Sequence, residues 1–454
     1  MIKLSDHFNA GRLIRFAFPS VIMLVFTSIY SVIDGFFVSN FVGKAAFTAI
    51  NFIWPFISML SVVGFMFGAG GSALIAKTYG EGNKKKANEI FSFVTYFSAG
   101  CGVVLGIAGI FFLRPVAIMF GASGEMLEQS IIYGVISLLA LPFYMLQCHF
   151  QYLFPAAEKP KLGLYITVAA GVSNAVFDAL FIVVFKWGIA GAAIATAVSE
   201  IVGGLIPIIY FAHKNTSILR LGRTSFHWKS LGKVCANGSS EFMSNLAMSV
   251  IGMFYNAQLM KYAGENGVAA FGVIMYASFV VNSVFMGFTT GTAPIVSYNY
   301  GAGNKEEVRN LLRLNLVIIG FASVISFVLA NLMAHPLSMI FVGYDQELYD
   351  MTVNAMSIYA LSFLFSGFAI FGSGFFTALN DGIVSAIIAF LRTFVFESTA
   401  IMIFPLIWGL DGIWLAVTGA EVMAVIVTVF FLVLNNKKYG YWKTSGGKRN
   451  AVAA

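Results

Sequence analysis

Long apolar stretches recur along nearly the whole chain and are separated by short polar segments. Stretches of about 20 residues or more are long enough to cross a bilayer as α-helices. They do not alternate with period two, as the strands of a membrane β-barrel do. The pattern predicts an all-α membrane protein with twelve transmembrane helices, at residues 13–39, 48–76, 90–113, 130–153, 162–185, 191–213, 234–260, 268–297, 310–334, 350–378, 384–407 and 412–434.

The composition agrees with a surface that faces lipid. Apolar residues make up 59% of the chain and charged residues only 10%, whereas soluble domains carry about 25% charged residues. The three cysteines lie in or next to apolar stretches, and the five histidines show no metal-binding spacing. We therefore expect no bound cofactor.

The basic residues are distributed unevenly between the two sides of the predicted membrane. Of the 27 Lys and Arg residues, 22 fall on the side of the N-terminus and 4 on the other side, while Arg392 lies inside a predicted helix. Because cytoplasmic loops are enriched in Lys and Arg, both termini are predicted to be cytoplasmic. The net charge of +7 thus reflects topology, and we expect no nucleic-acid partner. We expect residues 444–454 to be a disordered tail.

The chain contains two copies of a six-helix unit. With a constant offset of 221 residues, the run YGEGNK at 79–84 matches YGAGNK at 300–305, and Glu200 matches Glu421. An even number of helices per copy relates the copies by a pseudo-twofold axis along the membrane normal. We predict an N-terminal lobe over 1–221 and a C-terminal lobe over 222–454, with a central cleft between them.

The two YGxGNK runs predict tight turns between helices, because Gly and Asn favour turn conformations. They lack the GxxxxGK[ST] pattern of a phosphate-binding loop. No ATP-binding motif of that kind is present, so we expect an ion gradient to supply the energy.

Polar side chains cluster at one depth in the first copy. Asp34 lies on the first predicted helix with Tyr30 one turn before it, Asp178 lies on the fifth with Asn174 one turn before it, and Thr196 lies on the sixth. At 1.5 Å per residue, Asp34, Asp178 and Thr196 lie roughly 8–10 Å below the outer boundary. Buried carboxylates cost several kcal/mol unless they are paired, hydrated or protonated. We predict a site for Na⁺ or a proton, since hard cations prefer oxygen ligands.

The second copy lacks this cluster, which favours function over a structural role. The matching positions hold Tyr255, Val395, Thr399 and Val417. Glu200 lies one turn beyond Thr196 and could add a charge in the cleft. Its match Glu421 supports a symmetric structural role equally well.

Two further features of the predicted helices carry open alternatives. Pro19 interrupts the hydrogen bonds of the first helix, so ion binding at Asp34 could couple to bending there, or the kink could be static. Arg392 and Glu397 are five residues apart on one predicted helix. They could pair locally, or be satisfied by neighbouring helices or a water-filled cleft.

These features resemble the multidrug and toxic compound extrusion (MATE) family, and within it the DinF-like branch, over about residues 10–435. The matching features are the duplicated plan, the G-x-G-N turns, Pro19, Tyr30, Asp34, NAVFD at 174–178 and GAAIAT at 191–196. The resemblance implies a multi-pass transporter in the cytoplasmic membrane of a prokaryote. It would export cationic amphipathic drugs and dyes by H⁺ or Na⁺ antiport and alternating access, as a monomer and not an enzyme. The resemblance also implies that Asp34, Asn174, Asp178 and Thr196 bind the ion.

Two other function classes remain as alternatives. A flippase for a lipid-linked precursor would need a basic cleft for a pyrophosphate, and only Arg392 offers basic charge within the predicted helices. An intramembrane enzyme would need a catalytic set of polar residues at matched depth, which His149 alone does not supply. Organic cations and the lipid bilayer are therefore the expected partners.

Overall fold

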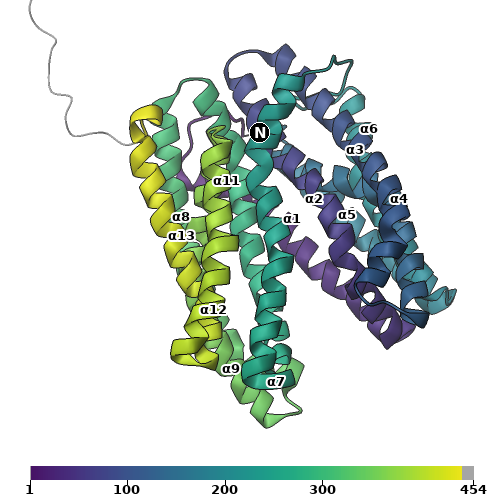
Figure 1. Ribbon diagram of the computed structural model, residues 1–454. Coiled ribbons are helices and arrows are strands. Elements are labelled where there is room, and N and C mark those ends of the chain that lie inside the picture. The colour runs from purple at the N-terminus through teal and green to yellow at the C-terminus, as the bar shows by residue number, and fades with distance from the viewer. Residues whose placement is uncertain (1, 442–454) are drawn as a thin grey trace, which may run out of the picture.

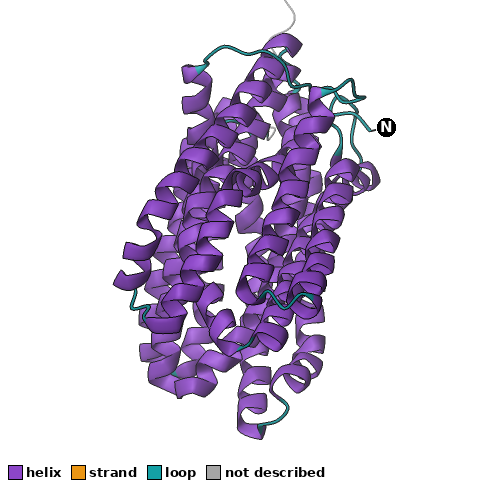
Figure 2. Ribbon diagram, turned by 90° about the vertical axis from the view of Figure 1, so that its right-hand side faces the viewer, coloured by secondary structure: helices purple, strands orange, loops and turns teal. Residues whose placement is uncertain are grey.

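The computed structural model describes residues 2–441, which form helices joined by short segments without any strand (Figures 1 and 2). The predicted tail at 444–454 lies outside the described residues. The first half of the chain forms α1 (Ala10–Phe37), η1 (Val38–Val42), α2 (Lys44–Gly80), α3 (Lys84–Met119), α4 (Gly124–Ala156), α5 (Pro160–Asp178), η2 (Ala179–Val184) and α6 (Gly188–Ala212).

The second half begins with α7 (Trp228–Gly301), so the predicted lobe boundary at 221/222 falls in the connection between α6 and α7. The remaining elements are α8 (Lys305–Val342), α9 (Gln346–Tyr359), η3 (Ala360–Ser362), α10 (Phe363–Ala378), α11 (Gly382–Phe390), η4 (Leu391–Phe396), α12 (Glu397–Trp408) and α13 (Leu410–Tyr439). Of the irregular segments, η1, η2 and η4 are π-helical and η3 is a 3₁₀ turn.

The prediction of twelve spans is confirmed. Eleven helical segments of the described chain are long and apolar enough to cross a membrane. One of them, α7, has 74 residues and contains a non-helical residue, Gly264, with φ 60° and ψ −149°. It therefore supplies two spans, which correspond to the predicted helices at 234–260 and 268–297.

The two halves form the two predicted lobes and meet at the end of the molecule where the N-terminus lies. The two YGxGNK runs, 79–84 and 300–305, also lie there, and we call it the turn-bearing end. In Figure 1 the ribbons of the first half (purple to blue) and the second half (teal to yellow) diverge away from this end. The largest contacts between the halves join α2 and α1 to the long helix α7.

Reciprocal glycine contacts show that the lobes are related by pseudo-twofold symmetry. Gly80 packs against the carbonyl group of Tyr298, and its match Gly301 packs against the carbonyl group of Lys77, which is the match of Tyr298. A Cβ atom at either glycine would lie 2.1 Å from the facing oxygen. Such an exchange of equivalent contacts is the mark of a twofold interface.

The YGxGNK runs form the tight turns that the sequence predicts, at the end where the lobes meet. Gly82 and Gly303 adopt positive φ angles of 84° and 72°, which glycine adopts without strain. The side chain of Asn83 accepts a hydrogen bond from the first turn of α3, and Asn304 does the same for α8. The turns thus cap the following helices while the preceding glycines bring the lobes together.

A segment before α1 bridges the lobes at the same end. The Leu4 N–H donates to Oε1 of Glu158 in the first lobe at 2.8 Å, and the Leu4 carbonyl accepts from Nδ2 of Asn299 in the second lobe at 3.3 Å. The Phe8 N–H donates to Oε1 of Glu307, also in the second lobe, at 3.0 Å. The side chains of Leu4 and Phe8 are buried. The segment is therefore tied to both lobes.

Replacing Glu158 with glutamine should stabilise the protein slightly near neutral pH. Burial raises the pKa of Glu158 above its ordinary value of 4.5, although the Leu4 N–H opposes the shift. The stability linked to a raised carboxyl pKa is present below the unfolded pKa and is lost as the pH rises through the folded pKa. Glutamine keeps an acceptor for Leu4 without the charge. Since Glu158 is half-exposed, we expect a gain of only a few tenths of a kcal/mol.

Thermal melting in detergent at pH 7.5 and pH 4.5 measures this effect. The difference between Glu158→Gln and the wild type should shrink at the lower pH. A variant that is less stable than the wild type at both pH values would contradict the prediction.

Candidate functional site

Three helices of the first lobe bring the predicted polar residues together. Because α5 packs against both α1 and α6, the last turns of α5 face both neighbours. The carboxyl group of Asp34 interacts directly with the side chains of Asp178, Asn174 and Thr196. Glu200 is close enough to interact electrostatically with Asp34. We call these five residues the first-lobe cluster.

Five oxygen atoms of this cluster have no hydrogen-bond partner. Asp178 is fully buried, and neither of its carboxylate oxygens receives a hydrogen bond. Oδ1 of Asp34, Oγ1 of Thr196 and Oε2 of Glu200 are also enclosed without a partner. Burying an ionised carboxylate without compensation costs far more than a protein can supply. The cluster therefore needs protons, a bound cation or both.

No basic side chain supplies that compensation. None of the interactions that act on Asp34, Asp178 and Glu200 in the described structure comes from a lysine or an arginine. Neutralisation of these carboxylates in the described structure is therefore left to protons or to a bound cation. Carboxylate, amide and hydroxyl oxygens suit Na⁺, and the direct approach of Asp34 to Asp178 also suits a shared proton.

In the second lobe, the carboxylate that matches Glu200 has a basic partner. Glu421, the match of Glu200, is held by Arg392 with Nη2 to Oε1 at 2.7 Å, and Nε to Oε1 at 3.1 Å and to Oε2 at 3.0 Å. The match of Arg392 in the first lobe is Gly171. A Cβ atom there would lie 2.6 Å from Cε1 of Phe26 and 3.0 Å from Cδ1 of Tyr30. An arginine cannot occupy this position unless these rings move, so Glu200 has no counterpart of Arg392 at the matching position.

Replacing Arg392 alone with glutamine should destabilise the protein by about 3 kcal/mol, because it leaves the buried carboxylate of Glu421 unpaired. The double variant Arg392→Gln/Glu421→Gln should recover most of this loss, because residue 421 then carries no charge. Thermal melting of both variants in detergent checks the prediction. If the double variant melted below the single variant, the pair would not be the source of the effect.

Tyr30, Pro19 and Arg392 differ in how they lie relative to the first-lobe cluster. The side chain of Tyr30 interacts with Gln147 and electrostatically with Glu200 and Asp34, so it belongs beside the first-lobe cluster. Pro19 is not part of it: the residue is buried in α1, and the helix continues through it. Arg392 pairs with a neighbouring helix rather than only within its own.

The sequence prediction missed the contribution of α4. Tyr133 interacts with Thr196 and with the charges of the first-lobe cluster, while Tyr144 and Gln147 lie beside Tyr30. Together with Ser137, these polar residues are spaced by four, seven and three residues along the helix. This periodicity marks one helix face and could have identified α4 as the fourth wall of the site.

Comparisons with known proteins place the chain among membrane exporters. The family model MatE matches residues 19–180 and 242–399. The multidrug export protein MepA of Staphylococcus saprophyticus subsp. saprophyticus is 25% identical over 423 residues, 93% of each chain. MepA of Staphylococcus haemolyticus is 23% identical over 421 residues, 92% of each chain.

Solved structures share the fold. A crystal structure of a MATE protein in the straight conformation superposes with a TM-score of 0.91 at 21% identity, covering 96% of this chain and 98% of the other. The outward-facing structure of a multidrug resistance MATE family transporter gives a TM-score of 0.88 at 22% identity, with the same coverage.

Proposed function

The chain belongs to the MatE family, and from this premise we propose that it exports cationic amphipathic drugs and dyes in exchange for H⁺ or Na⁺. The family resemblance seen in the sequence is thereby confirmed. The relatives named as multidrug export proteins match the chain over more than nine-tenths of their length, which supports multidrug export across the plasma membrane. We propose transport without an enzymatic reaction, by a single chain.

The observation that carries the proposal is the contrast between the lobes. Glu421 is neutralised by a fixed arginine, Arg392, whereas Asp34 and Asp178 face each other without any such group. A site that must be neutralised but has no cation of its own is suited to bind and release a cation in each cycle. We propose that the first-lobe cluster is the coupling site, with Tyr30 beside it.

The exchange of the coupling ion for the organic cation follows from the negative charge of the first-lobe carboxylates. Asp34 is partly exposed while Asp178 is fully buried, so an incoming ion reaches Asp34 first. A coupling ion that neutralises Asp34 weakens the electrostatic attraction of the whole protein for a second cation. An organic cation therefore binds best when the coupling ion has left, and the two cross the membrane in opposite directions.

The distribution of basic residues supports an orientation. We propose that the turn-bearing end faces the cytoplasm, which places both termini there. With the lobes in contact at that end through Gly80 and Gly301, the structure corresponds to the state that is closed to the cytoplasm. Flipping of a lipid-linked pyrophosphate is not favoured, since the carboxylates of the first lobe would repel it.

Efflux of ethidium from energised cells that lack their own pumps tests the proposal. Cells that express the protein are loaded with dye, and fluorescence is followed while the Na⁺ gradient and the proton gradient are removed in turn. Efflux that collapses with one gradient supports antiport and identifies the ion. Failure to extrude any of several cationic dyes would overturn the proposal.

A further inference from the structure

The π-helical segments of the described chain all adjoin acidic residues. The segment η1 follows Asp34 by one turn, and its first N–H bonds to the Asp34 carbonyl group. The segment η2 begins immediately after Asp178, and η4 ends immediately before Glu397. π-Helical turns are rare and occur frequently at functional sites. Two of the three π-helical segments adjoin the proposed coupling site, and the third adjoins Glu397 in the second lobe.

The segment η4 brings Glu397 to Arg392. Residues five apart on an α-helix point about 140° away from each other. A π-helical turn instead closes on the fifth residue, which brings the two side chains to one side. Glu397 interacts with both Arg392 and Glu421. Because Arg392 already bonds both oxygens of Glu421, the three groups carry one negative charge in excess when all are ionised.

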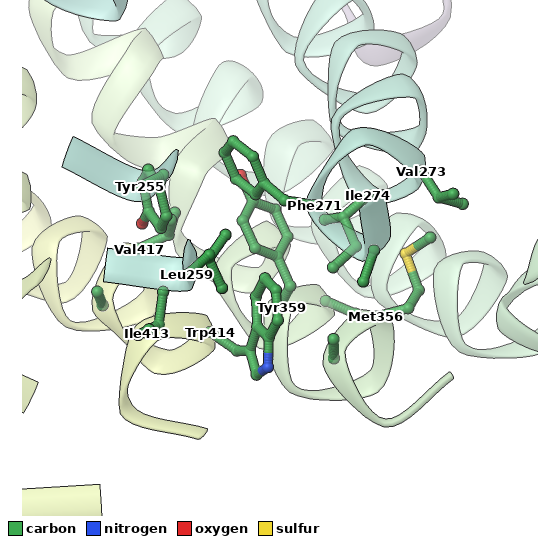
Figure 3. Packing of buried hydrophobic residues seen from close by; sticks show 14 of the residues in the cluster. Tyr255, Leu259, Phe271, Val273, Ile274, Met356, Tyr359, Ile413, Trp414 and Val417 are labelled. Atoms are coloured by element: carbon green, nitrogen blue, oxygen red, sulfur yellow. The ribbon is translucent and has the colours of Figure 1, made fainter. Parts of the chain in front are cut away.

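A buried tyrosine hydroxyl group is a second unusual feature of this part of the second lobe. Tyr255 is only 2% exposed and its hydroxyl group has no hydrogen-bond partner, while Glu397 is the charged group that acts on it most strongly. Tyr255 is also the sequence match of Asp34. Its ring stacks on Phe271 with centroids 4.7 Å apart, and Tyr255 and Tyr359 belong to one buried hydrophobic cluster (Figure 3).

We propose that Glu397, with the hydroxyl group of Tyr255, binds the cationic group of the organic substrate in the second lobe. The proposal rests on the proposed function as an exporter of organic cations. It separates the two cations of the exchange: the coupling ion binds in the first lobe, and the organic cation is drawn to the second.

The two sites differ in the groups that they offer. Three carboxylates, an amide and a hydroxyl group make up the first-lobe cluster, and such oxygen sets suit a small hard cation. The charge of Glu397 instead acts on Tyr255 and Tyr359, and the ring of Tyr255 stacks on that of Phe271. One carboxylate among aromatic rings suits a large organic cation, which gains from both charge and ring contacts. Glu397 is partly exposed in the described structure, whereas Tyr255 is buried.

Binding of ethidium to the purified full-length protein in detergent, followed by fluorescence anisotropy, tests the site. Glu397→Gln should raise the Kd for ethidium by about tenfold or more, the loss of roughly 1.4 kcal/mol of attraction. Glu397→Asp keeps the charge and should restore most of the affinity. Glu347→Gln makes the same change at an exposed position at the start of α9 and should leave the Kd unchanged.

A neutral lipophilic dye separates charge recognition from a structural effect. Its affinity should be the same in the wild type and in Glu397→Gln. An equal loss of affinity for both dyes, or ethidium binding by Glu397→Gln as tight as that of the wild type, would overturn this proposal. Neither outcome would affect the proposed function. A wild type that binds no organic cation would overturn the proposed function as well. A variant that keeps its dye affinity but releases fewer protons or Na⁺ ions per dye would make Glu397 a second ion site and also overturn the proposal.

Discussion

Asp34→Asn should lower gradient-driven dye efflux by about a hundredfold or more. Asparagine keeps the size of the side chain and removes the charge that attracts the coupling ion. The loss of one carboxylate from a buried ion site is expected to weaken ion binding by at least about 2.7 kcal/mol, which corresponds to two factors of ten. Asp178 and Glu200 remain in the variant, but both are less exposed than Asp34, so the most accessible carboxylate of the cluster is lost.

Initial rates of ethidium efflux in cells with matched expression measure this effect. Asp350→Asn is a suitable control, because Asp350 is exposed on α9 in the second lobe and its replacement should leave the rate unchanged. An Asp34→Asn variant that extrudes dye at the wild-type rate under the same gradient would exclude Asp34 as the coupling group.

The sequence predicted the membrane helices well, because the length of an apolar stretch and the constant offset between copies do not depend on packing. The depth argument put Asp34, Asp178 and Thr196 at one level, because depth follows from the distance along a helix, and in the structure the side chain of Asp34 interacts with the other two. It could not show which way each helix is turned about its axis. For that reason the pairing of Arg392 with Glu421 emerged only from the structure.

The π-helical segments show a second limit of sequence-based prediction. Each inserts a wider turn, so the face presented by the following residues shifts relative to an ideal helix. The segment η4 changes the relation of Arg392 to Glu397 in this way, and it has no counterpart at the matching position of the first lobe, where α5 is regular. The duplication therefore predicts the fold more closely than it predicts the polar groups inside it.

Alanine at both Gly80 and Gly301 should reduce transport to the background level. Each added Cβ atom would lie 2.1 Å from a backbone oxygen of the other lobe, far inside normal contact distance. Relief requires the backbones to separate, and overpacking of this kind costs about 1–3 kcal/mol at each position. Two such contacts at one interface would move most molecules out of the state with the lobes in contact. Without that state, alternating access stops.

Thiol accessibility measures the shift directly. In a variant without native cysteines, Ala73→Cys places a thiol at a buried position whose carbonyl group bonds to Asn380 of the other lobe. This thiol should react slowly in the wild-type background and rapidly in the double-alanine background. Gly100→Ala is the control, since a Cβ atom there meets nothing within 4 Å. Normal efflux together with a protected thiol in the double variant would mean that the lobes can meet without the glycine contacts. In that case the symmetric turns would serve only to cap α3 and α8.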